Sequence, residues 1–399
     1  MYKEKNILLN EEKIKQKSNK RNYIYLKLKA KIKNINTKKK KIKSYKTNKN
    51  SKNSTFFSNK YIIIIFIILG FISLYSIWKF FYFKYLLPKR HNIPIAFSLN
   101  DKYVYPLIVS LTSILYNASP NTFYIFYLLL GPKIPENKIN KILGLREKYP
   151  NCKINLIYMG DKFSNYRTSY YRSSAVYYRL ELSNLITGVD KIIYLDVDTM
   201  THKDLTELYN IDMGNYYYMG FPGHDLVYTI FNGTRNFINT GTILINLKKL
   251  REVNAPILFQ DYYNKYGTQK VDEYLINAVF YNKIKFLPLI YGIPDFGGGA
   301  KKTSSPSHFV EAFKNLTNFT KEEMESAHEN RAITHGCYDM TKWWQRKYHS
   351  LTDVGKQWFF YASKSNIFDD ICKEYKQFEK YCEKIKNRKQ YNIKDLNSF

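Results

Sequence analysis

The sequence Lys191-Ile-Ile-Tyr-Leu-Asp196-Val-Asp198-Thr-Met200 decides how the rest of the chain is interpreted. Its apolar run, residues 192–195, is rich in β-branched side chains and is typical of a strand buried on both faces of a parallel sheet. Residues i and i+2 of an extended chain project to the same side, so Asp196 and Asp198 can converge on one point. Ligands of open α/β sheets bind at the carboxyl ends of the strands, so these two carboxylates are well placed to hold a divalent metal ion.

An Asp-x-Asp triplet is weak evidence by itself, because the pattern is common in proteins that bind no metal ion. The apolar strand directly before Asp196 strengthens the case for a metal site. A metal ion held there could neutralise a diphosphate group and help it to leave. The motif therefore predicts metal-assisted chemistry only if other parts of the chain supply further polar groups.

The basic charge of the chain is concentrated at its N-terminus. The 399 residues carry a formal net charge of +30, and residues 1–60 alone carry 20 Lys and Arg against 3 acidic residues. Residues 1–60 lack a periodic apolar face, which predicts a basic, disordered cytosolic tail. Such a tail could bind nucleic acid or act as a nuclear address. We expect no nucleic-acid partner, because the folded part lacks recognisable base-stacking or groove-entering elements.

A long uncharged segment follows this tail. Residues 61–78 contain no charged side chain and would span about 27 Å as a helix, close to the hydrocarbon thickness of a bilayer. Lysines flank the segment, and Tyr61 and Trp78 stand where interfacial aromatic residues belong. The segment predicts a transmembrane signal-anchor over residues 61–80, with a buried core helix as the alternative. Residues 81–92 would form a short stem, and the folded domain would lie in the lumen.

Strands and helices alternate through residues 93–350, which predicts an α/β domain. Apolar patterns predict strands at residues 95–99, 122–130, 154–158 and 192–195, and helices at residues 103–116, 138–149 and 173–182. This alternation favours a Rossmann-like, mostly parallel central sheet flanked by helices, with a nucleotide as its expected ligand. No Gly-x-Gly-x-x-Gly follows the first strand and no Gly-Lys-Ser/Thr loop is present, so a dinucleotide fold or a P-loop has little support.

The C-terminal part of the chain is interpreted as supporting structure. Residues 311–331 and 353–388 are expected to form charged helices that pack around the domain, and residues 351–399 form a basic, helical tail. Cys372 and Cys382 are close enough in sequence to pair, but nothing in the sequence fixes that disulfide.

Further polar residues can join the two aspartates. Arg179 could pair with Asp196 or Asp198 or bind a phosphate, although an ordinary surface Arg is the alternative. Near the C-terminal end of the α/β region, His335 could complete a metal site and Lys342 could contact a diphosphate. A single histidine is more often structural than a metal ligand.

Two more motifs combine polar residues with a predicted strand or helix. Asn239 and Gly241 lie in a predicted polar turn before a buried strand, which suggests close approach of the backbone to a ligand. Asp272 and Glu273 begin an apolar helix, where acidic residues also complement the helix dipole without any further role.

In this order the motifs resemble those of the family 8 retaining glycosyltransferases, the glycogenin-like and lipopolysaccharide galactosyltransferase-like enzymes that use nucleotide sugars on a GT-A fold. The resemblance runs from about residue 93 to residue 344. It rests on six motifs, Ile95-Ala-Phe-Ser-Leu-Asn100-Asp101-Lys-Tyr103, Tyr178-Arg179-Leu180, Tyr194-Leu-Asp196-Val-Asp198, Asn239-Thr-Gly241, Asp272-Glu273 and His335 with Lys342-Trp343.

The resemblance implies a role for each matching residue. It implies a metal site for Mn²⁺, with Mg²⁺ as the alternative, formed by Asp196, Asp198 and His335. The UDP-sugar would be bound by Asn100, Asp101, Tyr103, Arg179, Asn239, Gly241 and Lys342. The catalytic residues would be Asp272, Glu273 and Arg179, and Asp225 matches a position that faces the acceptor.

Two motifs depart from the family pattern. Asn100 stands where many relatives have Asp, which predicts a changed contact to the base. The C-terminal motif of the family usually reads His-x-x-Gly-x-x-Lys-Pro-Trp. Here Gly336 directly follows the histidine, the lysine comes one residue late and the proline is missing. The assignments of His335 and Lys342 therefore depend on the tertiary structure.

The expected activity is Mn²⁺-dependent transfer of a hexose, glucose or galactose, from a UDP-sugar to a glycan, glycoprotein or glycolipid, with retention of configuration. Xylose and galacturonate are further donor candidates. The alternative is a catalytically inactive GT-A-fold protein that binds glycans. We expect a single-pass type II protein of the Golgi or ER membrane that can form a homodimer.

Overall fold

The computed structural model describes residues 54–81, 90–167, 173–223, 237–267, 272–295, 310, 319–336, 342–346 and 353–387, with the side chains of residues 54–63 and 80–81 left out. The chain divides into two compact units, Met1–Leu87 and Pro88–Phe399. Each unit is described by itself.

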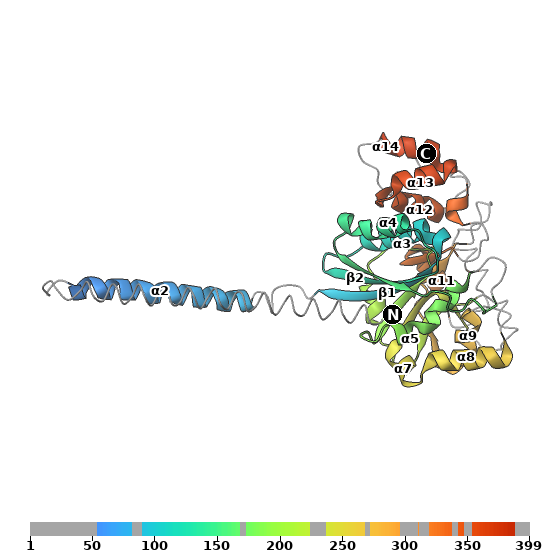
Figure 1. The fold of residues 1–399 in the computed structure, drawn as a ribbon, viewed down its shortest axis with the longest axis horizontal. Helices are drawn as coiled ribbons and strands as arrows, with labels where there is room; N and C mark the ends of the chain where they lie inside the picture. Colours follow the sequence, from blue (N-terminus) through green and yellow to red (C-terminus); the bar gives the residue numbers. More distant parts are fainter. Residues whose placement is uncertain are drawn as a thin grey trace. The chain divides into compact units, whose positions relative to one another are not determined.

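The first unit contributes helix α2 (Ser54–Phe81), which is 28 residues long (Figure 1). Its large apolar side chains from Ile64 to Trp78 are exposed. The side chains of α2 are described over residues 64–79, and among the residues described in this way no helix is both long and apolar enough to cross a bilayer. Helix α2 includes the predicted anchor at residues 61–80 and begins before it. Residues 1–53 of the predicted tail lie outside the described residues.

A seven-stranded sheet forms the centre of the second unit, with strand order β3-β2-β1-β4-β7-β6-β8. Strand β7 runs antiparallel to both of its neighbours, and the other six described strands share one direction. The mostly parallel α/β sheet predicted from the sequence is confirmed. The strands are β1 (His91–Leu99), β2 (Thr122–Leu130), β3 (Cys152–Tyr158), β4 (Lys191–Leu195), β6 (Tyr218–Pro222), β7 (Ile238–Asn246) and β8 (Ile284–Phe286).

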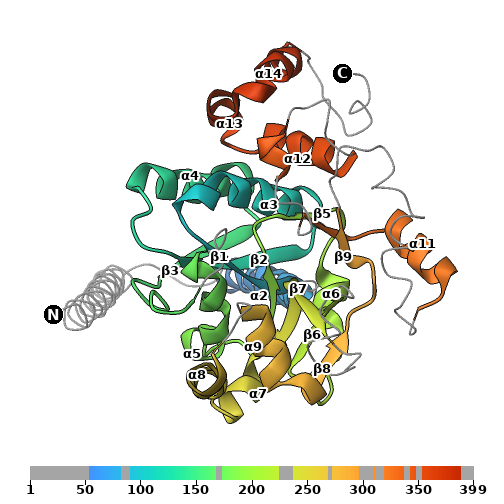
Figure 2. The ribbon, with the colours of Figure 1, turned by 90° about the vertical axis from the view of Figure 1, so that its right-hand side faces the viewer.

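Helices cover both faces of this sheet (Figure 2). Alternate residues of the central strand β1 point to opposite faces, so Ile95 and Phe97 join one apolar cluster and Ala96 joins another. The first face is covered by α3 (Val104–Tyr116) and α4 (Glu136–Lys148). The second face is covered by α5 (Leu182–Leu185), α7 (Leu247–Glu252), α8 (Ala255–Tyr266) and α9 (Asp272–Val279).

A small second sheet lies beside the end of β4. Strand β10 (Ile333–His335) pairs antiparallel with β5 (Thr199–Thr201) and parallel with β9 (Tyr291–Pro294). His335 is thereby placed opposite Thr199, although the two residues are far apart in the sequence. This pairing brings the C-terminal motif to the aspartates that follow β4.

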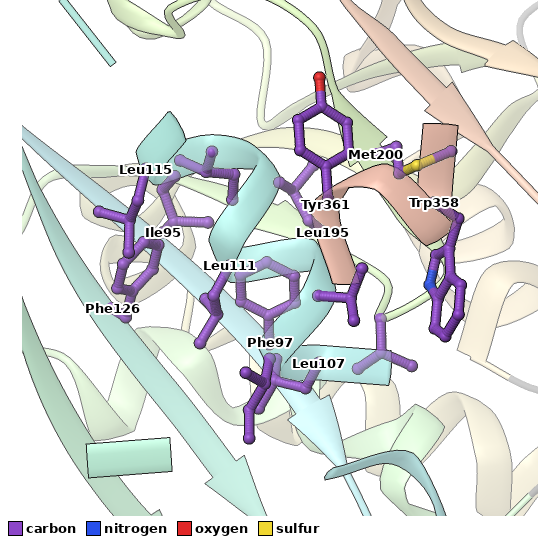
Figure 3. Close-up of a cluster of buried hydrophobic side chains, with 14 of the residues drawn as sticks. Ile95, Phe97, Leu107, Leu111, Leu115, Phe126, Leu195, Met200, Trp358 and Tyr361 are labelled. Atoms are coloured by element: carbon purple, nitrogen blue, oxygen red, sulfur yellow. The ribbon is translucent and has the colours of Figure 1, made fainter. Parts of the chain in front are cut away.

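The C-terminal region packs on the domain through α12 (Asp353–Lys364), which contacts α3. Figure 3 shows Trp358 and Tyr361 of α12 among the core side chains of β1 and α3. Helices α13 (Phe368–Glu374) and α14 (Glu379–Lys386) follow, joined by the disulfide Cys372–Cys382. The expected helix at residues 353–388 is therefore divided into separate helices. Of the helix expected at residues 311–331, α11 (Lys321–Glu329) is described, and residues 311–318 lie outside the described residues.

Two local predictions differ from the structure. The helix expected at residues 173–182 is a 3-10 helix, η3 (Ser174–Glu181), which continues into the short α5. The polar turn expected at Asn239–Gly241 belongs to strand β7. The pairing of β7 with β6 shifts register there, because Gly220 faces Ile243 whereas the next residue, Phe221, faces Asn239. This irregularity accommodates polar residues inside a strand that is otherwise apolar.

His202, which is half-buried and directly follows β5, should make stability depend on pH. Burial first, and then the charges of Arg331 and Lys203, together lower the pKa of His202 from 6.5 to about 3. The unfolded chain then binds more protons than the folded chain between these two values, so stability falls as the pH drops below about 6.5. Between pH 7.5 and pH 5 we expect His202 to account for about 2 kcal/mol of lost unfolding free energy.

The measurement is urea unfolding at both pH values for the wild type and for His202→Gln, which keeps a polar group near the Thr334 hydroxyl that His202 Nε2 contacts at 2.9 Å. The variant should lose about 2 kcal/mol less than the wild type over this pH range. Equal losses in the two proteins would show that His202 is not responsible.

Candidate active site

Asp196 and Asp198 lie on a turn that directly follows β4. The Asp196 N–H donates to the Gly241 carbonyl of β7 (2.8 Å), and the Asp196 carbonyl accepts from the Thr199 N–H (3.1 Å). The strand ends at Leu195, as predicted, but the two aspartates lie on a turn and not on the extended chain that their spacing predicts. The two carboxylates converge because the chain reverses into β5.

His335 completes a group of three side chains that could hold a metal ion, called the metal-binding group below. Its Nε2 lies 3.2 Å from Asp198 Oδ1 and 3.7 Å from Asp196 Oδ2. One ligand atom from each of the three residues lies within 4.8 Å of the others. The Gly336 N–H donates to the Asp198 carbonyl (2.9 Å), which holds the end of β10 against the turn. Two carboxylates and an imidazole fit a divalent cation in this space.

Gly241 leaves the space that the His335 ring occupies. A Cβ atom added to Gly241 would lie 1.9 Å from His335 Cε1 and 2.6 Å from each ring nitrogen. No larger residue can stand at this position unless the imidazole moves. The sequence predicts that the backbone at Gly241 approaches a ligand closely. In the structure, the group that Gly241 approaches closely is the His335 ring.

Arg179 is buried between two carboxylates. Its Nη2 lies 2.7 Å from Asp196 Oδ1, its Nε lies 3.0 Å from Asp272 Oδ2, and only 3% of its side chain is exposed. The guanidinium also lies 4.1 Å from the centre of the Tyr194 ring. Burial lowers the pKa of Arg179, but Asp196 and then Asp272 raise it by more, so it stays charged. The alternative of a surface arginine is therefore wrong.

The acidic start of α9 contacts the irregular part of β7. Glu273 Oε2 accepts from Asn239 Nδ2 (3.1 Å) and from the Thr240 N–H (3.3 Å). The Thr240 hydroxyl donates to Asp272 Oδ2 (3.2 Å). The side chain of Asn277 bonds both the N–H and the carbonyl of Ile238, which fixes α9 along β7. The predicted residues of these two motifs are thus brought together.

Lys342 reaches the metal-binding group in spite of its unusual spacing. Its Nζ lies 2.6 Å from Asp198 Oδ2 and donates to the Gly336 carbonyl (2.7 Å). Burial raises the pKa of Asp198, but Lys342 and then His335 lower it by more, so the pKa lies well below its usual range. Asp198 is therefore ionised at neutral pH and can act as a metal ligand.

The turn after β1 lies at the same end of the sheet. The 3-10 helix η2 (Asp101–Tyr103) begins there, capped by Asn100, whose Oδ1 accepts from the Lys102 N–H (3.1 Å). Asp101 is paired with Lys138 of α4 (2.8 Å). Burial raises the pKa of Tyr103 and the charge of Asp198 raises it further, which places this phenol near the metal-binding group. Asp225 lies outside the described residues.

Sequence reasoning missed three residues that support the site. The Tyr194 hydroxyl donates to Asp196 Oδ1 (3.2 Å), and its ring lies against Arg179. The carbonyl of Thr240 accepts from Arg179 Nη1. Asp295 is buried and accepts from Trp343 Nε1 (2.7 Å). Tyr194 and Thr240 lie inside motifs that were quoted, whereas Asp295 carries no signal in the sequence.

The family model for glycosyl transferase family 8 matches residues 94–347, which include all of the site residues described above and the whole sheet except the first three residues of β1. The chain belongs to this family. A Haemophilus influenzae protein named "Putative glycosyltransferase" is 33% identical over 204 residues, covering 48% of this chain and 61% of that protein. Glycosyltransferase GlyF of Streptococcus pneumoniae is 26% identical over 159 residues, covering 40% of this chain and 37% of GlyF. The chain thus spans less than two thirds of either relative.

Solved structures share the fold. The apo structure of the bifunctional glycosyltransferase WbbM superimposes with a TM-score of 0.58 at 19% identity, covering 71% of this chain and 51% of that one. A complex of the galactosyltransferase LgtC with donor and acceptor sugar analogs gives a TM-score of 0.55 at 20% identity, covering 69% of this chain and 96% of LgtC. The second unit therefore has the GT-A-like fold of these structures.

Gly241→Ala should weaken metal binding, because the added methyl group cannot fit unless the His335 ring moves. We expect the dissociation constant for Mn²⁺ to rise about 10- to 100-fold, the cost typical of disturbing the orientation of a metal ligand. Binding can be followed through the loss of the free Mn²⁺ signal in electron paramagnetic resonance.

Gly188→Ala is the matched control, because a Cβ atom at Gly188 has no neighbour within 4 Å. This variant should bind Mn²⁺ like the wild type. Circular dichroism should show that both variants are folded. Unchanged Mn²⁺ affinity in a folded Gly241→Ala protein would contradict the assignment of His335 as a metal ligand.

Proposed function

We propose that the chain is a metal-dependent retaining glycosyltransferase that moves a hexose from a UDP-sugar to a glycan, glycoprotein or glycolipid. The observation that carries this proposal is the convergence of Asp196, Asp198 and His335 on one point at the carboxyl ends of the strands. Arg179 and Lys342 add two cations to the same place. Open α/β sheets bind nucleotides at this edge.

The donor set fits a divalent metal ion. Asp196 and Asp198 offer carboxylate oxygens and His335 offers Nε2, and we propose Mn²⁺ over Mg²⁺ because an imidazole is among the ligands. When bound, the metal ion would neutralise the negative charge of the diphosphate and favour its departure. Tyr194 and Arg179 hold Asp196 through Oδ1, whereas His335 lies near Oδ2.

The cations of the chain would stabilise the leaving group. Lys342 lies within reach of Asp198 and of the Gly336 carbonyl, so its ammonium stands beside the place where the diphosphate would bind. The bond between the anomeric carbon and UDP breaks, and UDP keeps the electron pair. The acceptor hydroxyl attacks the same face of the sugar and gives up its proton, which retains the configuration.

The polar residues of β7 and α9 would bind the sugar. Asn239 and Glu273 bond to each other, so each group is oriented before a substrate arrives. Asp272 is occupied by Arg179 and Thr240, which supports a positioning role for it. On the nucleotide side, we propose that the turn from Asn100 to Tyr103 receives uracil and ribose.

The test is UDP release by the purified full chain in detergent, with Mn²⁺ and one donor at a time. UDP-glucose, UDP-galactose, UDP-xylose, UDP-galacturonate and UDP-N-acetylglucosamine would be compared. We expect turnover of one donor, abolished by chelation. Replacement of Asp196 and Asp198 by Asn should reduce it at least about a hundredfold, because the ligands that position the metal ion are lost.

Asp190→Asn is the matched control, because this carboxylate is exposed and pairs with Arg251 at a distance from the metal ligands. Its activity should equal that of the wild type. Binding of Mn²⁺ and UDP without turnover would call for an added acceptor glycan. A wild type that binds glycans but neither UDP nor Mn²⁺ would overturn the enzyme assignment in favour of an inactive, glycan-binding protein.

We also propose that residues 61–80 anchor the chain in the Golgi or ER membrane as a type II protein. The support is the uncharged sequence from Tyr61 to Trp78 and the continuous exposure of its apolar side chains on α2 from Ile64 onward. Replacement of Ile67 and Phe71 by Lys should release the protein from membranes, because each lysine costs about 2.5–3.5 kcal/mol at the centre of a spanning helix.

Carbonate extraction of cell membranes measures this release. Ile257→Lys on α8 is the matched control, because Ile257 is also an exposed isoleucine. The wild type and this control should stay in the membrane pellet. A wild-type protein that appears in the carbonate supernatant would refute the anchor.

A further inference from the structure

Asp295 is a buried carboxylate that none of the motifs includes. It directly follows β9, and only 3% of the residue is exposed. Its backbone N–H donates to the His335 carbonyl (2.9 Å), and its Oδ2 accepts from Trp343 Nε1 (2.7 Å) in a buried hydrogen bond. One residue thus contacts both the strand that carries the proposed metal ligand and the tryptophan beside Lys342.

The Trp343 ring lies against the backbone that Lys342 contacts. A Cβ atom added to Gly336 would lie only 3.0 Å from Trp343 Cζ2, so the indole packs closely over this glycine. The Gly336 carbonyl accepts from Lys342 Nζ (2.7 Å). The indole therefore restrains both partners of the hydrogen bond between Lys342 and Gly336. Trp343 is the next residue after Lys342 in the chain, and its ring packs on Gly336.

Chain connectivity alone does not place Lys342. Five residues separate it from Gly336, and the proline that usually follows the lysine in the family pattern is missing. A 3-10 helix, η6 (Trp343–Gln345), begins directly after Lys342, and the Lys342 N–H donates to Gln345 Oε1 (2.9 Å). The described hydrogen bond of its indole goes to Asp295, and the ring also packs over Gly336 within the apolar core.

The charge of Asp295 is balanced locally. Burial lowers the pKa of Arg331 and of Arg346, and the charge of Asp295 opposes this shift in both. A buried carboxylate is costly even when it is compensated, and an apolar side chain could fill the same space with less desolvation. The hydrogen bond that Asp295 accepts from the Trp343 N–H is a role that an apolar side chain could not fill.

We propose that Asp295 is a positioning residue that places Lys342 at the proposed diphosphate site through its hydrogen bond to Trp343. The proposal rests on the proposed function for the role of Lys342 toward UDP, but the placement of Lys342 can be tested without any substrate. Replacing Asp295 by Ala should free the η6 segment, so that Lys342 loses its contacts with Asp198 and Gly336.

The substrate-free test is limited acetylation of the full-length protein with acetic anhydride, quantified by mass spectrometry. We expect Lys342 to react on the order of tenfold faster in Asp295→Ala than in the wild type, because it loses a charged hydrogen bond. Lys141 is the internal reference, since it is ion-paired with Asp370 at 2.6 Å and 28% exposed, against 21% for Lys342. Its reactivity should not change.

Two further variants separate the hydrogen bond from general destabilisation. Trp343→Phe keeps a ring over Gly336 but removes the N–H, and it should raise the reactivity of Lys342 as Asp295→Ala does. Asp295→Asn keeps an oxygen acceptor and should hold the reactivity near the wild-type value. Unchanged Lys342 reactivity in Asp295→Ala and Trp343→Phe, or no rescue by Asp295→Asn, would overturn the proposal.

Calorimetric titration with UDP and Mn²⁺ then tests whether the position of Lys342 affects the affinity for UDP. Asp295→Ala and Lys342→Ala should each weaken UDP binding about tenfold, and the double variant no more than either one, because both changes remove the same interaction. Fully additive losses would overturn the coupling. A wild type that binds no UDP would refute the proposed function, and the acetylation result would still decide whether Asp295 positions Lys342.

Discussion

The site depends on one buried cation held between two carboxylates. Arg179 bonds to Asp196 at the end of β4 and to Asp272 at the start of α9, and it is almost fully removed from solvent. It compensates the charge of buried Asp272 and of half-buried Asp196. Removing one partner of a buried ion pair leaves an uncompensated charge that typically costs about 3–5 kcal/mol. The guanidinium therefore ties the turn that holds Asp196 to the start of α9.

Around this network, the backbone of β7 does two things at once. The strand runs antiparallel within a parallel sheet, and its register shift against β6 carries the polar segment that contacts Glu273, Asp272 and Arg179. Gly241 in the same segment leaves room for the His335 ring. A regular apolar strand could pair with its neighbours equally well. Its side chain at position 241 would, however, fill the space in which the His335 imidazole lies beside the two aspartates.

The parts of the fold and of the site that depend on neighbouring residues in the chain could be predicted from the sequence. The continuous apolar runs of β1, β2 and β4 predict buried parallel strands, and the aspartates at the end of β4 predict a metal site at that edge. The errors occur where tertiary contacts override local preference. Asn239 is typical of a turn, yet it lies in a strand because β6 pairs along β7, with Phe221 opposite Asn239. The composition of residues 353–388 predicts a charged helix. Trp358 nevertheless lies in the core, because only one side of α12 is polar.

The sequence by itself determined the strands as far as β4, the family-like motifs and the two carboxylates of the candidate metal site, because each depends on neighbouring residues in the chain. Only the tertiary structure decided that His335 and Lys342 reach Asp198, since their spacing departs from the family pattern. The antiparallel pairing of β10 with β5 brings His335 to the turn, and the Asp295–Trp343 bond fixes the segment beside Lys342. Contacts between residues more than 130 positions apart depend on how separate strands pack, which no local pattern encodes.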